Sequence, residues 1–375
     1  MKPFLSPYAT KTFLIAAFCT VIAGVLGVLL GYRFLTHIAT PRLGIAGDRF
    51  SINGTPTFLL GVSYFDALGW KASDFDELAA RQFNLIRIWM DWRVWTDRSR
   101  TFFDVDGTLR YPQTLLALVR AAGARGLMVD VTILNGASLS HDIPQAMHGI
   151  GAAENAVRKT VGLLKDEPNV FFDLVNEHDG RDSSLALHAT MAALVGAARQ
   201  ADADAMITFS SCDACRPHLL ASDTTAHGTM VNEELDAGSQ WLTPHFSRCG
   251  EWSNLIDVRV RTLKQYLQST GRNVPVYLQE ESRRKGVNCG TDPTQADFLQ
   301  AATEARDAGA AGWVFHTDAG FDLSGSQTFF SRLDNTERAT VDALGRAVFG
   351  SDAVSPTSSA GKTRRPANFL PARLW

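Results

Sequence analysis

Residues 170–177 read VFFDLVNE, a pattern that recurs along the chain. Six mostly apolar, β-prone residues run from Val170 to Val175 and end in a polar pair, Asn176-Glu177. A short apolar run of this kind is typical of a strand buried on both faces, as in a parallel sheet. The sequence therefore predicts a strand here with two reactive side chains at its carboxyl end.

Similar runs recur along the chain and alternate with stretches of helical periodicity, which predicts parallel βα units. Eight units over about 300 residues favour an α/β fold of the closed (β/α)8 TIM-barrel type. No Gly-rich dinucleotide fingerprint follows the first run, which argues against a Rossmann fold. The expected strands are Phe58 to Ser63, Asn84 to Trp89, Leu127 to Leu134, Val170 to Val175, Ala205 to Phe209, Gln240 to His245, Val274 to Gln279 and Ala311 to His316.

Most of the helices between these strands are marked by capping residues and apolar periodicity. The expected helices are Ser73 to Phe83, Pro112 to about Gly123, Ala153 to Leu164, Ser183 to Arg199, Asn254 to Ser269, Thr294 to Asp307 and Thr336 to Phe349. A hairpin precedes the barrel, because Asn53-Gly54 separates two short β-prone runs within Phe50 to Leu59.

The chain divides into three parts by composition. Residues 13–32, FLIAAFCTVIAGVLGVLLGY, hold no charge and are about as long as a transmembrane helix must be. We therefore expect an N-terminal transmembrane anchor and linker over residues 1–42, with a cleaved secretory signal as the alternative. The barrel occupies residues 43–350, and residues 351–375, rich in Ser, Pro, Ala and Arg, form a flexible tail.

The overall charge limits the classes of partner. A formal net charge of -3, with no long block of like charge, leaves no electrostatic footprint for nucleic acid. Basic residues flank the apolar segment almost equally, so the positive-inside rule does not fix its orientation. We expect the anchored barrel to be monomeric and to lie on the periplasmic or extracellular side.

A second acidic pair ends the seventh run, where residues 275–281 read PVYLQEE. Strands four and seven face each other across a closed barrel, so Glu177 and Glu280 can approach to about 5–5.5 Å, the separation used by retaining glycoside hydrolases. Neighbouring strand residues face opposite ways, and counting from Pro275 favours Glu280 over Glu281. The alternative makes Glu280 a structural partner of an arginine such as Arg283 or Arg284.

A second Asn-Glu pair, Asn232-Glu233, serves as an internal control for the first. It lies between a polar segment and further acidic residues and reads as a loop. Position at the end of a strand, rather than the dipeptide itself, singles out Asn176-Glu177.

Together these motifs resemble the clan A glycoside hydrolases, most closely family 5, the cellulase-like barrels. The resemblance covers about Phe50 to Phe349. It rests on the entry NGTPTFLLGV, Arg87 in NLIRIW, Asn176-Glu177, His245, the P-V-x-x-x-E spacing from Pro275 to Glu280, and Trp313.

The resemblance implies a role for each matching residue. Glu177 resembles the acid/base, Glu280 the nucleophile, and Arg87 the cation that keeps the nucleophile ionised. Asn176 resembles the residue that binds the sugar 2-hydroxyl, and His245 the histidine beside the acid/base. Trp313 resembles the platform beneath the sugar. Trp89, with Trp92 and Trp95, offers further stacking faces, for which core packing is an equal alternative.

Two positions depart from the family pattern. Asn135 stands where a histidine often ends the third strand, and Phe246 stands in place of the tyrosine usual near His245. Because that tyrosine donates a hydrogen bond to the nucleophile, another group must substitute or the activity is altered. Tyr64 is the candidate substitute.

The principal hypothesis is a retaining O-glycosyl hydrolase that acts on a β-linked oligo- or polysaccharide and needs no metal or organic cofactor. The alternative is a catalytically silent barrel that binds carbohydrate during envelope glycan handling. A metal-dependent hydrolase is disfavoured because the nine histidines form no H-x-H or H-E-x-x-H pattern.

Four cysteines follow the fifth, sixth and seventh runs, on loops of the predicted catalytic face. In an exported domain they are expected to form one or two disulfides. A four-thiolate zinc site is the alternative, although only Cys212-x-x-Cys215 has ligand spacing. The set comprises Cys212, Cys215, Cys249 and Cys289.

Overall fold

A computed structural model describes residues 40–94, 96–140, 146–179, 188–212, 224–246, 248, 252–285 and 292–350. The chain separates into two compact units, Met1–Ala39 and Thr40–Trp375. The predicted membrane anchor at residues 13–32 and the predicted tail at 351–375 lie outside the described residues. Within the described part of the chain, no helix is both long and apolar enough to cross a bilayer.

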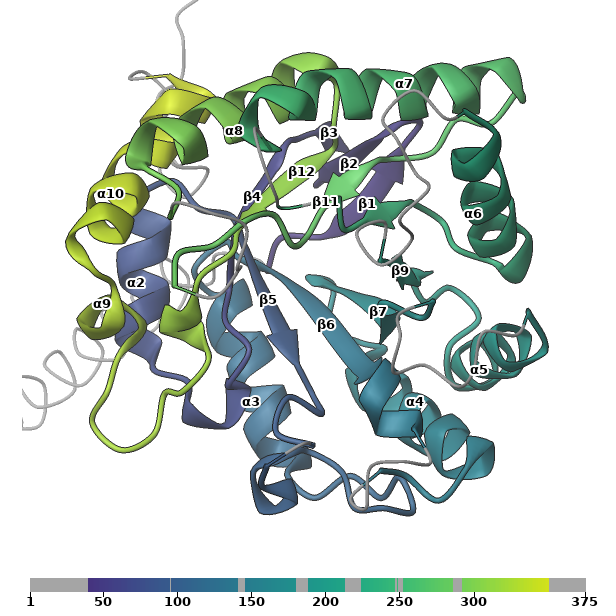
Figure 1. Ribbon diagram of the computed structural model, residues 1–375. Helices are drawn as coiled ribbons and strands as arrows, with labels where there is room; N and C mark the ends of the chain where they lie inside the picture. Colours follow the sequence, from purple (N-terminus) through teal and green to yellow (C-terminus); the bar gives the residue numbers. More distant parts are fainter. Residues whose placement is uncertain are drawn as a thin grey trace, which may run out of the picture. The chain divides into compact units, whose positions relative to one another are not determined.

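The second unit is built around seven parallel strands in the order β11-β12-β4-β5-β6-β7-β8, with helices packed around them (Figure 1). Each strand lies within a predicted run or extends one residue beyond it, so the eight-run prediction is confirmed for these seven. Their bounds are β4 Leu59–Ser63, β5 Leu85–Trp89, β6 Met128–Asn135, β7 Val170–Asn176, β8 Ile207–Thr208, β11 Tyr277–Leu278 and β12 Gly312–Phe315.

The sixth predicted run closes the circle between β8 and β11. A short strand β9 (Ser210–Ser211) continues β8 and pairs in parallel with β10 (Thr243–Pro244). On the other side, the backbone N–H of Leu242 donates to Pro275 O at 2.9 Å, and Leu242 forms a parallel bridge with Val276. The arrangement fits a (β/α)8 barrel.

Eight longer helices follow the strands in the described part of the chain. They are α2 Ala72–Ala80, α3 Pro112–Gly123, α4 Ile150–Leu164, α5 His188–Ala201, α6 Thr224–Ala237, α7 Ile256–Ser269, α8 Gln295–Ala308 and α10 Asn335–Phe349. Short turns lie between them: η1 Ala67–Gly69, η2 Arg98–Arg100, η3 Gly136–Leu139, η5 Trp252–Leu255, η6 Asp318–Gly320 and α9 Phe329–Arg332.

Helix α6 corrects the prediction that Asn232-Glu233 lies in a loop. Val231 and Glu234 are both fully buried on the same side of this helix. Because a carboxylate occupies a position on the buried face, the apolar periodicity that identifies an amphipathic helix is interrupted. Glu234 is held there by His178, whose Nε2 lies 3.3 Å from its Oε1.

An antiparallel sheet of β1 (Leu43–Ala46), β2 (Arg49–Ile52) and β3 (Thr55–Pro56) precedes the barrel. Its turn confirms the predicted hairpin, since Asn53 and Gly54 have φ angles of 53° and 79°, as the tight hairpin turn requires.

This sheet covers the amino-terminal end of the barrel. The ring of Phe50 packs against Phe171, Trp241 and Tyr277, with centroids 5.4, 5.6 and 5.9 Å away. We call these four side chains the basal aromatic cluster. Each is fully buried, and burial of apolar surface stabilises the fold by about 25 cal/mol per Å². The opposite end of the barrel is left for polar side chains.

Candidate active site

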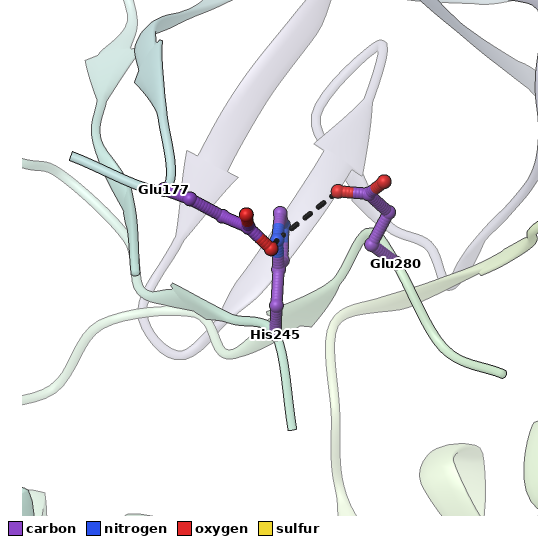
Figure 2. A group of neighbouring side chains, drawn as sticks. All are labelled: Glu177, His245 and Glu280. Carbon is purple, nitrogen blue, oxygen red and sulfur yellow. Dashed lines mark hydrogen bonds and ion pairs between the residues drawn. The ribbon is translucent and has the colours of Figure 1, made fainter. Parts of the chain in front are cut away.

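Three polar side chains converge at the carboxyl end of the barrel strands (Figure 2). Glu177 follows β7, His245 follows β10, and Glu280 lies two residues after β11. The two carboxyl groups point toward each other with the imidazole ring between them, and one donor atom from each residue lies within 4.8 Å of the others. This separation matches retaining glycosidases, whereas inverting enzymes hold the pair about 6.5–9.5 Å apart.

Glu177 is placed by an unusual backbone conformation. Its φ angle is 48°, in the left-handed region that costs a non-glycine residue roughly 1 kcal/mol. Its backbone N–H donates to Ser210 Oγ at 3.0 Å, which holds the turn where the chain leaves β7. The side chain is 29% exposed, compared with 7% for Glu280, so Glu177 is the more accessible carboxyl group.

His245 contacts both carboxylates with the same atom. Its Nδ1 lies 3.1 Å from Glu177 Oε1 and 3.1 Å from Glu280 Oε2. Its Nε2 lies 3.2 Å from Gln279 Oε1. Gln279 cannot turn its amide around without loss, because its Nε2 donates to Asp130 Oδ2 at 2.7 Å.

Both ring nitrogens of His245 therefore face acceptors, and both must carry a proton to satisfy them. Burial alone would lower the pKa of His245, but the Glu280 and Glu177 carboxylates raise it above its usual value. The geometry favours a proton on each ring nitrogen, and the raised pKa of His245 acts in the same direction.

Glu280 is surrounded by positive charge. Arg87 Nη1 lies 3.3 Å from Glu280 Oε2, and Arg248 Nη2 lies 3.6 Å from the same oxygen. Burial would raise the pKa of Glu280, but His245, Arg248 and Arg87 hold it far below its usual value. Glu280 is therefore an ionised carboxylate in an almost water-free position, as a nucleophile must be.

Arg87 also organises the neighbouring strand ends. Its guanidinium is fully buried and donates to Asn176 Oδ1 at 2.6 Å and to Asp173 Oδ2 at 3.3 Å. Its Nε donates to Thr132 Oγ1 at 3.1 Å. The predicted group of Arg87, Asn176, Glu177, His245 and Glu280 is thus brought together in space.

The Glu280 register predicted from Pro275 agrees with these contacts. The arginines proposed as structural partners of Glu280 pair elsewhere, since Arg283 Nε lies 2.6 Å from Asp318 Oδ1 and Arg284 Nε lies 2.7 Å from Asp334 Oδ2. Glu281 is 1% exposed.

Trp313 requires a correction, because its side chain does not face the site. In β12 it pairs with Leu278 of β11, whereas the inward-facing Tyr277 pairs with Gly312. Successive strand residues face opposite sides, so Trp313 points with Phe315 toward helix α8, where Phe315 contacts Phe298 at 4.9 Å. Trp313 is fully buried and offers no face to a sugar.

His316 occupies the position near the nucleophile that Trp313 was expected to fill. It follows β12 on the inward face, and its Nε2 lies 3.5 Å from Glu280 Oε1 and 3.0 Å from Arg283 Nη1. Burial and the neighbouring arginines Arg248, Arg283 and Arg87 lower the pKa of His316 well below its usual value despite the opposing effect of Glu280. Accepting a hydrogen bond from Arg283 fits this neutral form.

Tyr64 and Asn135 are also used differently from the prediction. The Tyr64 hydroxyl donates to Asp74 Oδ2 at 2.6 Å and accepts from the backbone N–H of Lys71 at 3.1 Å. It is therefore committed to helix α2 and does not substitute for the missing tyrosine beside Glu280. Asn135 begins the turn η3, where its Oδ1 accepts from Ser138 N at 3.1 Å.

Trp89 and Phe246 take packing positions next to the site. Trp89 is 6% exposed and stacks on Phe65 at 4.5 Å, with the Arg87 guanidinium 5.3 Å from its ring centroid. Phe246 is fully buried, and the guanidinium of Arg259 lies 5.4 Å from its centroid. Trp95 lies outside the described residues.

Arg248, His316, Gln279 and Asp130 were not singled out from the sequence. His316 and Gln279 do end predicted strands, so position alone offered a signal for these two. Arg248 lies beyond the end of its strand, where no periodic pattern applies.

The donor atoms of Glu177, His245 and Glu280 are close enough to share one small cation. Protonated His245, Arg87 and Arg248 already surround Glu280 Oε2, so a metal ion would have to compete with three cationic side chains at that oxygen. The donor set fits an ion-paired acid pair better than a metal centre.

One predicted cysteine lies among the described residues. Cys212 is disulfide-bonded, and its backbone N–H donates to Asp179 Oδ1 at 2.7 Å. Cys215, Cys249 and Cys289 lie outside the described residues.

Known structures share this fold. A β-glucanase from Saccharophagus degradans, solved with cellotetraose, matches with a TM-score of 0.56 and 14% identity, over 82% of this chain and 93% of that one. The β-mannanase of Streptomyces thermolilacinus matches with a TM-score of 0.56 and 16% identity, over 84% and 99%. The β-mannanase of the blue mussel Mytilus edulis matches with a TM-score of 0.53 and 16% identity, over 82% and 97%. No functionally curated protein matches the chain.

A parallel barrel with two opposed glutamates at its carboxyl end, one oxygen of each within 4.8 Å of the other, has the geometry of a retaining glycoside hydrolase. The family model described as cellulase (glycosyl hydrolase family 5) matches residues 43–317 of this chain. The chain belongs to this family and is a retaining glycoside hydrolase.

Proposed function

We propose that the protein cleaves a β-linked glycan by double displacement, with Glu280 as nucleophile and Glu177 as acid/base. The opposed carboxyl groups, with Glu280 ionised among three cations, carry the proposal. The names of the structurally similar glucanase and mannanases support a β-linked glucose or mannose polymer as substrate class.

In the first step, a Glu280 oxygen forms a bond to the anomeric carbon while the glycosidic C–O bond breaks. The departing oxygen takes the proton of Glu177. In the second step, Glu177 removes a proton from water, the water oxygen bonds to the anomeric carbon, and the bond to Glu280 breaks. Two inversions return the original anomeric configuration.

Product stereochemistry tests this mechanism without knowledge of the natural substrate. The full chain is offered β-glucans and β-mannans, and the anomeric proton of the new reducing end is followed by NMR before mutarotation. Initial formation of the β-anomer is expected. Initial formation of the α-anomer would overturn the retaining assignment of the two glutamates.

Leaving-group dependence tests the role of Glu177. Glu177→Gln should slow cleavage of natural glycans about 10²–10⁴-fold, but it should slow glycosylation by a dinitrophenyl glycoside much less because that leaving group needs no proton. Glu233→Gln is the matched control, because it alters the other Asn-Glu pair, in α6. Binding of glycan without turnover by the wild-type protein would favour the silent carbohydrate-binding barrel.

We further propose that the enzyme is membrane-anchored with its barrel outside the cytoplasm. The uncharged residues 13–32 support an anchor, and the disulfide at Cys212 supports an oxidising compartment. Protease added to intact cells, or to spheroplasts for a periplasmic barrel, should remove a C-terminal tag from the full chain. Complete protection of a tag that is digested after lysis would place the barrel in the cytoplasm.

A further inference from the structure

Arg248 stands in a symmetrical position with respect to the two catalytic carboxyl groups. Its Nη2 lies 3.5 Å from Glu177 Oε1 and 3.6 Å from Glu280 Oε2. Its Nε donates to the backbone oxygen of Glu280 at 3.2 Å, which anchors the guanidinium beside the pair. The side chain is 18% exposed, so it borders the accessible side of the site.

The three cationic side chains around the two catalytic carboxyl groups differ in whether they contact one carboxyl group or both. His245 Nδ1 is 3.1 Å from each carboxyl group, and Arg248 is also nearly equidistant from both. Arg87 contacts Glu280 at 3.3 Å, and its other close partners are Asn176, Asp173 and Thr132, deeper in the barrel. Among the described residues, His245 and Arg248 are the cationic side chains that contact both Glu177 and Glu280.

This distinction matters because the negative charge moves during the reaction. Before the first step the charge lies on Glu280, and Glu177 holds the proton. When Glu280 becomes an ester and the departing oxygen takes that proton, the charge lies on Glu177. A cation fixed between the two positions is already in place for the charge that develops on Glu177 in the first step and on Glu280 in the second, so no group has to reorganise as the charge moves.

We propose that Arg248 is a catalytic residue that, together with His245, stays paired with the negative charge as it passes from Glu280 to Glu177 and back. This inference rests on the proposed double displacement. It assigns a role in both steps to Arg248, four residues after the end of β10, whereas Arg87 pairs with Glu280.

Separate measurement of the two steps tests the inference. With a dinitrophenyl glycoside that the wild type cleaves, stopped-flow kinetics give the rate of glycosylation from the burst and that of deglycosylation from the steady state. Arg248→Met should slow both steps, each about 10–100-fold, because it removes a charge that stabilises both transition states. Arg87→Lys should slow deglycosylation more than glycosylation, because Arg87 stabilises the Glu280 carboxylate, which is the leaving group of the second step.

Three further variants and conditions separate this role from a general loss of structure. Arg248→Lys should recover part of both rates, and added guanidinium ion should partly rescue Arg248→Ala, whose short side chain leaves room for it. Arg261→Met is the control, because Arg261 is 53% exposed and pairs only with neighbouring surface groups on and near α7. Normal rates for both steps in Arg248→Met would overturn the inference.

Titration of Glu280 needs no substrate turnover, so it can test the role of Arg248 separately from the proposed glycan cleavage. In protein labelled with ¹³C at the glutamate carboxyl carbons, the Glu280 resonance should titrate at a higher pH in Arg248→Met than in the wild type, because one of its cations is gone. If no glycan is cleaved but this shift appears, the proposed function fails and the charge pairing stands. Turnover with an unshifted Glu280 would overturn the pairing.

Discussion

The two ends of the barrel interior are built from opposite kinds of side chain. At the amino-terminal end, Phe50, Phe171 and Trp241 pack with centroids 5.3–5.6 Å apart. From the middle of the barrel toward its carboxyl end, Arg87, Asp130 and Asp173 are equally buried but charged or titratable. Burial of apolar rings is favourable, whereas burial of charge costs several kcal/mol per ion unless each charge is paired.

Tyr277 joins the two ends. Its ring belongs to the basal aromatic cluster, with the Phe50 centroid 5.9 Å away, while its hydroxyl donates to Asp130 Oδ2 at 3.0 Å. Asp130 in turn orients Gln279, and Gln279 orients His245. The comparison indicates that burial of apolar rings at one end stabilises the folded state. This stabilisation offsets the free energy that it costs to remove the two carboxyl groups at the other end from water.

The largest expected effect lies at the charged end. Glu280→Gln should lower kcat on any substrate about 10⁵-fold or more, because loss of a nucleophile removes the covalent route. The same substitution should change the free energy of unfolding only slightly, since Arg87 keeps its contacts with Asp173 and Asn176. Chemical denaturation alongside kinetics checks both parts, and residual activity above one per cent would contradict the assignment.

The next largest effect is expected at the apolar end, where a substitution should lower stability and leave kcat unchanged. Phe50→Ala should cost about 3–5 kcal/mol of unfolding free energy, because it leaves a cavity among Phe171, Trp241 and Tyr277. The kcat of the molecules that remain folded should be unchanged. Urea unfolding measures the stability, and active-site titration corrects the rate. A fall in kcat without a fall in stability would break the proposed division between the two ends.

A smaller, pH-dependent effect is expected at the middle of the barrel. Burial raises the pKa of Asp130 to about 7 despite the nearby Arg87, so the folded protein holds this proton more tightly than the unfolded chain does. The stability that this proton contributes is complete below about pH 4 and is lost as the pH rises toward 7.

Asp130→Asn should remove this loss, since asparagine does not ionise. Its stability relative to the wild type should therefore rise by roughly 1 kcal/mol for each pH unit between about 4 and 7. Paired thermal denaturation across this range is the measurement. A difference that is constant with pH would show that Asp130 is ionised throughout.

The smallest effect is expected outside both ends. Arg81 Nε lies 2.7 Å from Asp342 Oδ1 and links α2 to α10, with side-chain exposures of 26% and 48%. Asp342→Asn should change the unfolding free energy by less than about 1 kcal/mol, because water screens exposed ion pairs. A larger change in the unfolding free energy measured with urea would mean that this exposed ion pair between the outer helices stabilises the fold more than a screened pair should.

The strand pattern was predictable because a parallel strand buried on both faces leaves a continuous apolar run. The same logic placed Glu177 and Glu280 together, since both follow such runs. It failed for Trp313, where the residue type matched the resemblance but the two-residue alternation pointed the ring outward. His316, three residues later, has the parity of the inward face and lies beside Glu280.

Other misses have physical causes that no local pattern reveals. Tyr64 is held by Asp74 of α2, a contact fixed by tertiary packing. The buried Glu234 concealed the apolar face of α6. Arg248 reaches the site from a loop, and its importance depends on two distances that only the folded chain defines.

The most direct test of the central claim is covalent trapping of the nucleophile. The full chain is incubated with a panel of 2-fluoro-glycosides and epoxide glycosides of the β-gluco and β-manno series, and labelled peptides are sequenced by mass spectrometry. The account predicts a single label on Glu280, formed at a reduced rate in Arg248→Met. A label on Glu281 or Glu177 in place of Glu280, or no label on a demonstrably folded sample that cleaves glycan, would contradict it.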